Sequence, residues 1–164
     1  MAEFTKRQNK KIKFLGMRVI KTIIAVYICF LISLLTKSLP FYSAIAAILC
    51  MQNSPEDSYE VGKNRMIGTL IGGLYGFVAV TLMEFIDIEL FQHMHYLILT
   101  LFLIPLIYTN VMCESRDSTY ISCVVFLSIT VSHGGDASPL MFALSRVINT
   151  IIGIVVSIAV NWAL

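Results

Sequence analysis

Apolar runs separated by short polar segments follow one another along almost the whole chain. Four of them, at residues 17–36, 65–83, 96–113 and 141–164, have about the 20 residues that a helix needs to cross a bilayer. Two more, at 41–52 and 120–132, are short for a crossing, which predicts helices that are tilted, re-entrant or partly buried among their neighbours. The runs predict an all-α integral membrane protein with six membrane helices, of which the second and the fifth are short.

Two of the long runs share a pattern of small residues that follows an arginine. Spacings of three and four place one set of residues on a single helical stripe, namely Arg65, Gly68, Thr69, Gly72 and Gly76. A shift of 81 positions places this stripe on Arg146, Asn149, Thr150, Gly153 and Ser157, and it also superposes the two short runs. We therefore expect two three-helix repeats, at about 1–83 and 84–164. Because three is odd, the second repeat must be inverted relative to the first, which is a recurring transporter design.

Composition assigns the chain to the lipid bilayer. Hydrophobic residues make up 57% of the sequence and charged residues 13%, with a mean hydropathy of +0.82, whereas a soluble domain has about 45–50% apolar and about 25% charged residues. We expect one transmembrane domain over 17–164, preceded by a basic N-terminal segment at 1–16. The net charge of +2 is too small to indicate binding to nucleic acid.

The distribution of charge predicts the orientation in the membrane. Among residues 1–21, Glu3 is the only acid, and the cations are Lys6, Arg7, Lys10, Lys11, Lys13, Arg18 and Lys21. Because cytoplasmic segments carry an excess of Lys and Arg, we expect the N-terminus in the cytoplasm, and six spans return the C-terminus to the same side. The polar segment 53–64 is expected to be a cytoplasmic loop that can contain a short helical turn, capped by Ser54 and with Pro55 in its first position.

The sequence lacks the signatures of catalysis and of bound cofactors. Four cysteines lie in or beside apolar runs without CxxC or His-paired spacing, which is typical of small core residues: Cys29, Cys50, Cys113 and Cys123. No GK[ST] follows the glycine-rich run, and no acid/base constellation lies within the spans. The sequence therefore indicates neither an enzyme, nor a cofactor, nor a metal site.

Charged residues at the ends of, or within, apolar runs are the candidates for a substrate path. Arg65, at the inner end of its span, can be either an interfacial anchor or part of an anion path. Arg146 lies inside an apolar run and needs a partner or water, and Asp136 is the nearest candidate partner. Thr69 and Thr150 lie one turn further along the same two helix faces.

Two further cations and six small residues complete the candidate set. Arg18 and Lys21 belong to the first turn of the first span, where we expect cytoplasmic anchors that can also attract anions to an inner vestibule. The small residues of the two stripes are expected to serve helix packing rather than substrate contact: Gly68, Gly72, Gly76, Asn149, Gly153 and Ser157.

The segment from Pro40 to Gly73 resembles a known family. It reads PFYSAIAA at 40–47, MQ at 51–52, EDS at 56–58 and GKNRMIGTLIGG at 62–73. This order is similar to the membrane domain of bacterial aromatic acid exporter family proteins, which belong to the fusaric acid resistance superfamily and also resemble the plant aluminium-activated malate transporters. The element NRxxGTxxG at 64–72 is its most specific part.

The resemblance implies a six-helix membrane domain, often dimeric, that exports or conducts organic anions. In the plant relatives basic residues line the anion path, which gives weight to Arg65 and, through the repeat, to Arg146. Family members commonly continue past the last helix into a cytoplasmic helical domain, whereas this sequence stops at Leu164. We expect either that the membrane unit works alone or that it relies on a separate cytoplasmic partner.

The sequence leads to one main hypothesis and one alternative. The main hypothesis is a homodimeric carrier or channel of the cell (plasma) membrane that exports small organic anions, expected to be aromatic carboxylates. Arg65 and Arg146 would supply positive charge to the carboxylate, and the two threonines would supply hydroxyl groups. The alternative is a membrane interaction module without transport, in which the glycine stripe assembles helices and both arginines are structural.

Overall fold

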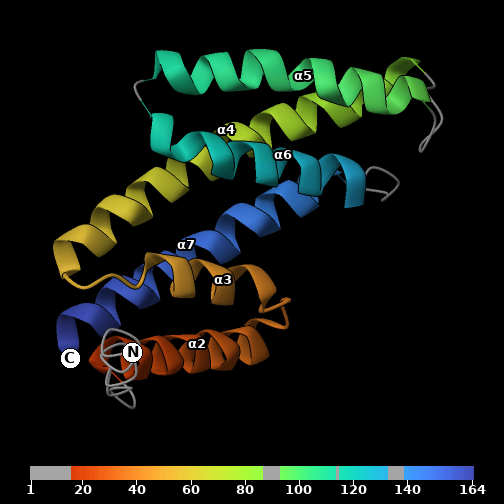
Figure 1. Ribbon diagram of the computed structural model, residues 1–164. Helices are drawn as coiled ribbons and strands as arrows, with labels where there is room; N and C mark the ends of the chain where they lie inside the picture. Colours follow the sequence, from red (N-terminus) through yellow and green to blue (C-terminus); the bar gives the residue numbers. More distant parts are fainter. Residues whose placement is uncertain (1–15, 87–92, 114, 133–138) are drawn as a thin grey trace, which may run out of the picture.

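The computed structural model describes residues 16–86, 93–113, 115–132 and 139–164. In these segments the chain forms six α-helices and one short 3₁₀ helix (Figure 1). Their bounds are α2 Met17–Thr36, α3 Phe41–Cys50, α4 Pro55–Ile86, α5 His93–Met112, η1 Arg116–Ser118, α6 Thr119–Ser132 and α7 Pro139–Ala163. The expectation of an all-α membrane protein is confirmed at this level.

Four of the described helices, α2, α4, α5 and α7, are long and apolar enough to cross a membrane. The other two are shorter, with 10 residues in α3 and 14 in α6, which agrees with the short runs in the sequence. Successive helices alternate in direction, so that their ends gather at the left and the right of the view in Figure 1. The start of α2 and the end of α7 lie on the same side.

The third helix is longer than the sequence predicts. We expected a polar loop at 53–64 and a span from residue 65, but α4 begins at Pro55 and continues without a break to Ile86. The predicted cap is present, because Ser54 Oγ accepts a hydrogen bond of 3.1 Å from the backbone N–H of Asp57. Glu56 and Asp57 also place negative charge at the positive end of the helix dipole. Since α4 contains no proline after Pro55, its first turn extends directly into the span.

The two longest helices, α4 and α7, cross in the middle of the molecule (Figure 1). Helices α5 and α6 pack on α4, and α2 and α3 pack on α7. Each group has its own apolar core. One core joins α2, α3 and α7 through residues that include Cys29, Met51 and Val156, and the other joins α4, α5 and α6 through residues that include Met83, Leu106 and Phe126. The packing is therefore reciprocal between the two halves of the chain.

The closest contacts in the fold join backbone to backbone. A Cβ atom at Gly72 of α4 would overlap the carbonyl oxygen of Ser122 in α6 and would lie 3.0 Å from the Cα atom of Ser122. A Cβ atom at Gly153 of α7 would overlap the carbonyl oxygen of Ser43 in α3 and lie 2.6 Å from Ala46 Cβ. Distances this short leave no room for any side chain, so these two glycines set how closely the long helices approach the short ones.

Gly68 and Gly76 extend the same contact in both directions along α4. A Cβ atom at Gly68 would lie 2.7 Å from the carbonyl oxygen of Ser118, and one at Gly76 would lie 3.1 Å from Ile129 Cβ. The stripe at 68–76 therefore faces the start and the middle of α6.

The two reciprocal contacts can be compared with the spacing that the sequence pattern suggests. Gly153 follows Gly72 by 81 positions, as the sequence pattern suggests, but Ser122 follows Ser43 by only 79. The single shift of 81 that the sequence suggested for the short runs is therefore wrong by two residues. In the sequence, Ser122 and Gly153 are 31 positions apart, whereas Ser43 and Gly72 are 29 positions apart.

We predict that Gly72→Ala lowers the free energy of unfolding by about 1–3 kcal/mol, because the new methyl group overlaps the backbone of α6. The matched control is Gly73→Ala on the adjacent position, where the nearest atom, Val147 Cγ2, lies 3.9 Å from the added Cβ. This control should leave stability unchanged or raise it slightly, since alanine favours helix over glycine. Thermal unfolding of the purified proteins in detergent, followed by circular dichroism, compares the two, and equal melting temperatures would contradict the packing described.

Candidate functional site

Helices α4 and α7 contact each other through residues that lie beside the two sequence stripes. Ile154 Cγ2 lies 2.7 Å from the position of a Cβ atom at Gly62, and Val147 Cγ2 lies 3.9 Å from one at Gly73. The two helices therefore run antiparallel at the crossing, with the start of one beside the end of the other. This register places Thr69 and Thr150, both almost fully buried, near the middle of the crossing.

Arg65 lies one helical turn from this point, on the side toward the start of α4. Its Nε atom is buried and has no hydrogen-bond partner in the described part of the chain. The Cys50 thiol and the Tyr120 hydroxyl lie near enough to interact with its charge. Arg65 as a whole is half-buried, and Nε is the atom shown to lie inside the protein.

Arg146 lies one turn from the crossing on the opposite side, and it is only 8% exposed. Its Nη1 atom donates a hydrogen bond to Ser128 Oγ in α6. Its guanidinium carbon lies 4.1 Å from the centre of the Tyr42 ring, in the range of a cation–π interaction. The suggested partner Asp136 lies outside the described residues.

The two arginines are near enough to repel each other electrostatically. The structure thus brings together four of the predicted path residues, Arg65, Thr69, Arg146 and Thr150. The hydroxyl of Thr69 donates a 2.8 Å hydrogen bond to the carbonyl oxygen of Arg65 in its own helix. In this rotamer its proton is not directed at a ligand.

The other two predicted path residues, Arg18 and Lys21, have partners within the protein. Arg18 Nε donates to the carbonyl oxygen of Met51 at 2.9 Å. Lys21 Nζ donates to Asn161 Oδ1 at 3.0 Å and to the Asn161 carbonyl oxygen at 3.3 Å. These cations therefore tie the start of α2 to the link after α3 and to the end of α7.

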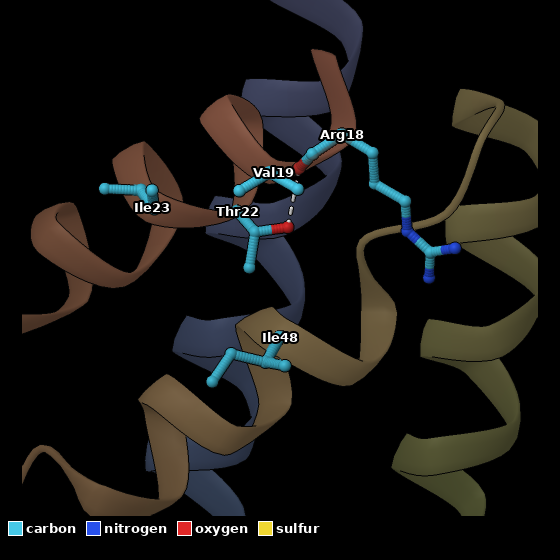
Figure 2. A pocket seen from close by; sticks show the side chains of 5 residues that line it. All are labelled: Arg18, Val19, Thr22, Ile23 and Ile48. Carbon is cyan, nitrogen blue, oxygen red and sulfur yellow. Dashed lines mark hydrogen bonds between the residues drawn. The ribbon is translucent and has the colours of Figure 1, made fainter. Parts of the chain in front are cut away.

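A groove of about 270 Å³ lies beside Arg18, between α2 and α3, and is lined by Arg18, Val19, Thr22, Ile23 and Ile48. Figure 2 shows the Arg18 side chain leaving this groove and pointing toward the link between α3 and α4. The other polar group, the Thr22 hydroxyl, donates to the Arg18 carbonyl oxygen at 2.7 Å (Figure 2). The groove is therefore apolar along its length and directs no cation at a bound anion.

A second hollow, of about 320 Å³, lies where α4 meets η1 and α6. It is lined by Glu60, Val61, Asn64, Asp117 and Tyr120. Tyr120 connects it to Arg65, whose charge it interacts with. The two carboxylates would repel an anion, so we do not assign this hollow to an anion path.

A model of a protein family, described as "Aromatic acid exporter family member 1", matches residues 13–164. The chain belongs to this family. The resemblance seen in the sequence is thereby confirmed, and a membrane exporter of aromatic acids or related anions is the function that membership implies. Neither a curated protein nor a solved structure matches the chain.

Three polar residues of this aromatic acid exporter family protein went unnoticed in the sequence. Tyr42 and Ser128 surround Arg146 from two other helices, and no local pattern links them to it. Asn161 is 3% exposed, and its Nδ2 atom donates to the carbonyl oxygens of Gln52 and Ser54 and to Ser58 Oγ. The one sequence feature that could have pointed to Asn161 is the presence of an amide side chain in the last turns of an otherwise apolar span.

We predict that Asn161→Ala lowers the free energy of unfolding by about 1–3 kcal/mol, because three partners lose a donor in a buried position. Asn53→Ala is the control, since Asn53 is an exposed amide in the same link and its loss should change little. Thermal unfolding in detergent measures both variants. If the two melt at the same temperature, the network around Asn161 does not stabilise the fold.

Proposed function

We propose that this chain forms a path for small organic anions, namely aromatic carboxylates, and that Arg65 and Arg146 supply the positive charge that attracts them. The observation that carries the proposal is the buried Nε of Arg65, which has no hydrogen-bond partner in the described residues, together with the guanidinium of Arg146 on the other side of the α4–α7 crossing. Family membership supports an exporter of aromatic acids or related anions. The choice of aromatic carboxylates as substrate rests on these two arguments together.

The physical reason is charge compensation. Two like charges that interact inside a protein raise the free energy of the folded state, and a buried charge without a counter-charge is costly. None of the groups acting on Arg65 or Arg146 is a carboxylate in the described residues. A carboxylate between them would lower both costs, and a guanidinium can bind its two oxygens with two parallel hydrogen bonds.

The proposed arrangement in the membrane follows from the reciprocal packing. Helices α2–α4 and α5–α7 would form two inverted repeats of three crossing helices, and transporters of this design bind their substrates near the midplane at the interface between the repeats. The crossing of α4 and α7 would be part of that interface, together with the contacts of α4 with α6 and of α3 with α7. The excess of cations in residues 1–21 supports cytoplasmic termini in the plasma membrane. We further propose that the functional unit is a homodimer.

Arg65→Gln should reduce benzoate flux into proteoliposomes by about 10- to 100-fold at low substrate, because a charged hydrogen-bonding group is lost from the path. Arg65→Lys should fall between this variant and the wild type, since it keeps the charge but loses the planar fork. Lys63→Gln is the matched control, because Lys63 is an exposed cation two residues away on the same helix.

Radiolabelled benzoate uptake measures these rates, with circular dichroism to show that each variant is folded. Unchanged flux in folded Arg65→Gln would exclude Arg65 from the path. If the wild-type protein itself carries no benzoate or related anion, the remaining interpretation is a module that assembles membrane helices without transport.

A further inference from the structure

The hydroxyl of Ser157 in α7 is a buried polar group that the packing of the helices does not need. Ser157 is 0% exposed, and its Oγ atom has no hydrogen-bond partner in the described residues. The related position of the first half is Gly76, which packs without any side chain. Because a buried hydroxyl without a partner destabilises the folded state, Ser157 Oγ points to a partner that the described chain does not supply.

Helices α3 and α7 run parallel to each other. Near their starts, the guanidinium carbon of Arg146 lies 4.1 Å from the centre of the Tyr42 ring. After the end of α3, the Asn161 side chain in the last turn of α7 donates a 3.2 Å hydrogen bond to the carbonyl oxygen of Gln52. Residues that follow one another along α3 therefore meet residues that follow one another along α7.

This register places Ser157 beside Cys50. Between the two contacts just described, a Cβ atom at Gly153 would lie 2.6 Å from Ala46 Cβ. Ser157 follows Gly153 by four residues, and Cys50 follows Ala46 by four, so each lies one turn further along the same helix face. Both Ser157 and Cys50 are 0% exposed, which agrees with a place between the two helices.

The Arg65 side chain reaches the same region from α4. Ile154 Cγ2 lies 2.7 Å from the position of a Cβ atom at Gly62, so the second half of α7 lies beside the early turns of α4. Helical side chains lean toward the N-terminus of their own helix, which directs Arg65 toward this contact. The Cys50 thiol is near enough to interact with the charge of Arg65. Arg65, Cys50 and Ser157 therefore converge where α3, α4 and α7 meet.

We propose that Arg65 and Ser157 together form the binding position for the carboxylate group of the anion. The Nε–H and one Nη–H of a guanidinium lie along one edge, in one plane, and donate two parallel hydrogen bonds to the oxygens of a carboxylate. The Ser157 hydroxyl donates a third hydrogen bond to the same carboxylate. The proposal rests on the proposed function and adds Ser157 as the residue that fixes where the carboxylate binds.

Hydrogen bonding separates this position from the second arginine of the path. Arg146 Nη1 already donates to Ser128 Oγ, whereas the buried Nε of Arg65 has no partner in the described residues. A carboxylate at Arg65 and Ser157 gains hydrogen bonds from two buried groups without displacing a protein partner from either. Both costs of burial, that of the Arg65 donor and that of the Ser157 hydroxyl, are lowered by one ligand group.

Ser157→Ala separates ligand binding from stability. Removal of a buried hydroxyl without a partner should leave the melting temperature of the ligand-free protein unchanged or raise it. The benzoate concentration that gives half-maximal stabilisation should rise about 10-fold, because a hydrogen bond to a charged group is lost. Thermal unfolding of the full chain in detergent, titrated with benzoate, measures both quantities without requiring transport. Benzamide, which lacks the charge, should not raise the melting temperature of either protein.

Ser33→Ala is the matched control. Ser33 is a buried serine, 6% exposed, whose hydroxyl donates to the carbonyl oxygen of Ser38. Its loss should lower the melting temperature and leave the affinity for benzoate unchanged, which is the opposite pattern. If Ser157→Ala does not fold, Ser157→Gly removes the same hydroxyl, introduces the residue found at the related position of the first half, and provides the same measurements.

The outcomes separate this proposal from the proposed function. A Ser157→Ala protein that binds benzoate as tightly as the wild type overturns the role of Ser157, even if benzoate is transported. A lower melting temperature with unchanged binding assigns the hydroxyl to a structural water and also overturns it. Weaker binding by folded Ser157→Ala, with Ser33→Ala unchanged, supports the proposal even if every variant lacks flux. If the wild type shows neither benzoate binding nor flux, the proposed function fails and this proposal fails with it.

Discussion

The fold depends on two places where helix backbones touch, Gly72 against Ser122 and Gly153 against Ser43. In a membrane the hydrophobic effect does not bring helices together, because lipid tails are as apolar as leucine, so close van der Waals contact has to hold them. A long helix therefore packs tightly on a short helix only at positions where the long helix has no side chain. This holds whether the short helix belongs to the same half of the chain or to the other half. Here the tight pairs are α4 with α6 and α7 with α3, which means that each long helix crosses over to the opposite half.

This exchange between halves bears on the position of the two arginines, of which Arg146 is buried and Arg65 half-buried. Each arginine is one turn from the stripe of small residues that a long helix presents to its partner, so tight packing at the stripe draws the nearby guanidinium inward. Long cationic side chains at the end of a membrane helix normally extend to the interface. Arg146, only 8% exposed, does not follow this rule, and Ser128 together with the face of Tyr42 provides the partners that the interface would have supplied.

Local patterns in the sequence were sufficient to predict where most of the helices begin and end. Apolar runs located all six helices to within a few residues at most ends, and the spacing of Gly68, Gly72 and Gly76 identified the face that packs. The start of α4 was missed because residues 55–64 are polar and have no apolar period, although Ser54 and Pro55 gave the correct start signal. The partners of Arg146 could not be predicted, since Tyr42 and Ser128 come from other helices and only the tertiary packing brings them near. The two-residue offset between α3 and α6 likewise depends on a link length that has no local signature.

Hydrogen bonding separates the polar groups that stabilise this protein from those that are available to a ligand. Asn161 and Asn110 are buried amides whose polar atoms bond to Gln52, Ser54 and Ser58 in one case and to Ser118, Ser122 and the Leu106 carbonyl oxygen in the other. Such closed networks hold helix ends together and leave nothing to bind. Arg65 differs, because its buried Nε has no hydrogen-bond partner in the described residues. A charge of this kind is retained against a free-energy cost, and under the proposed function a bound anion would lower that cost.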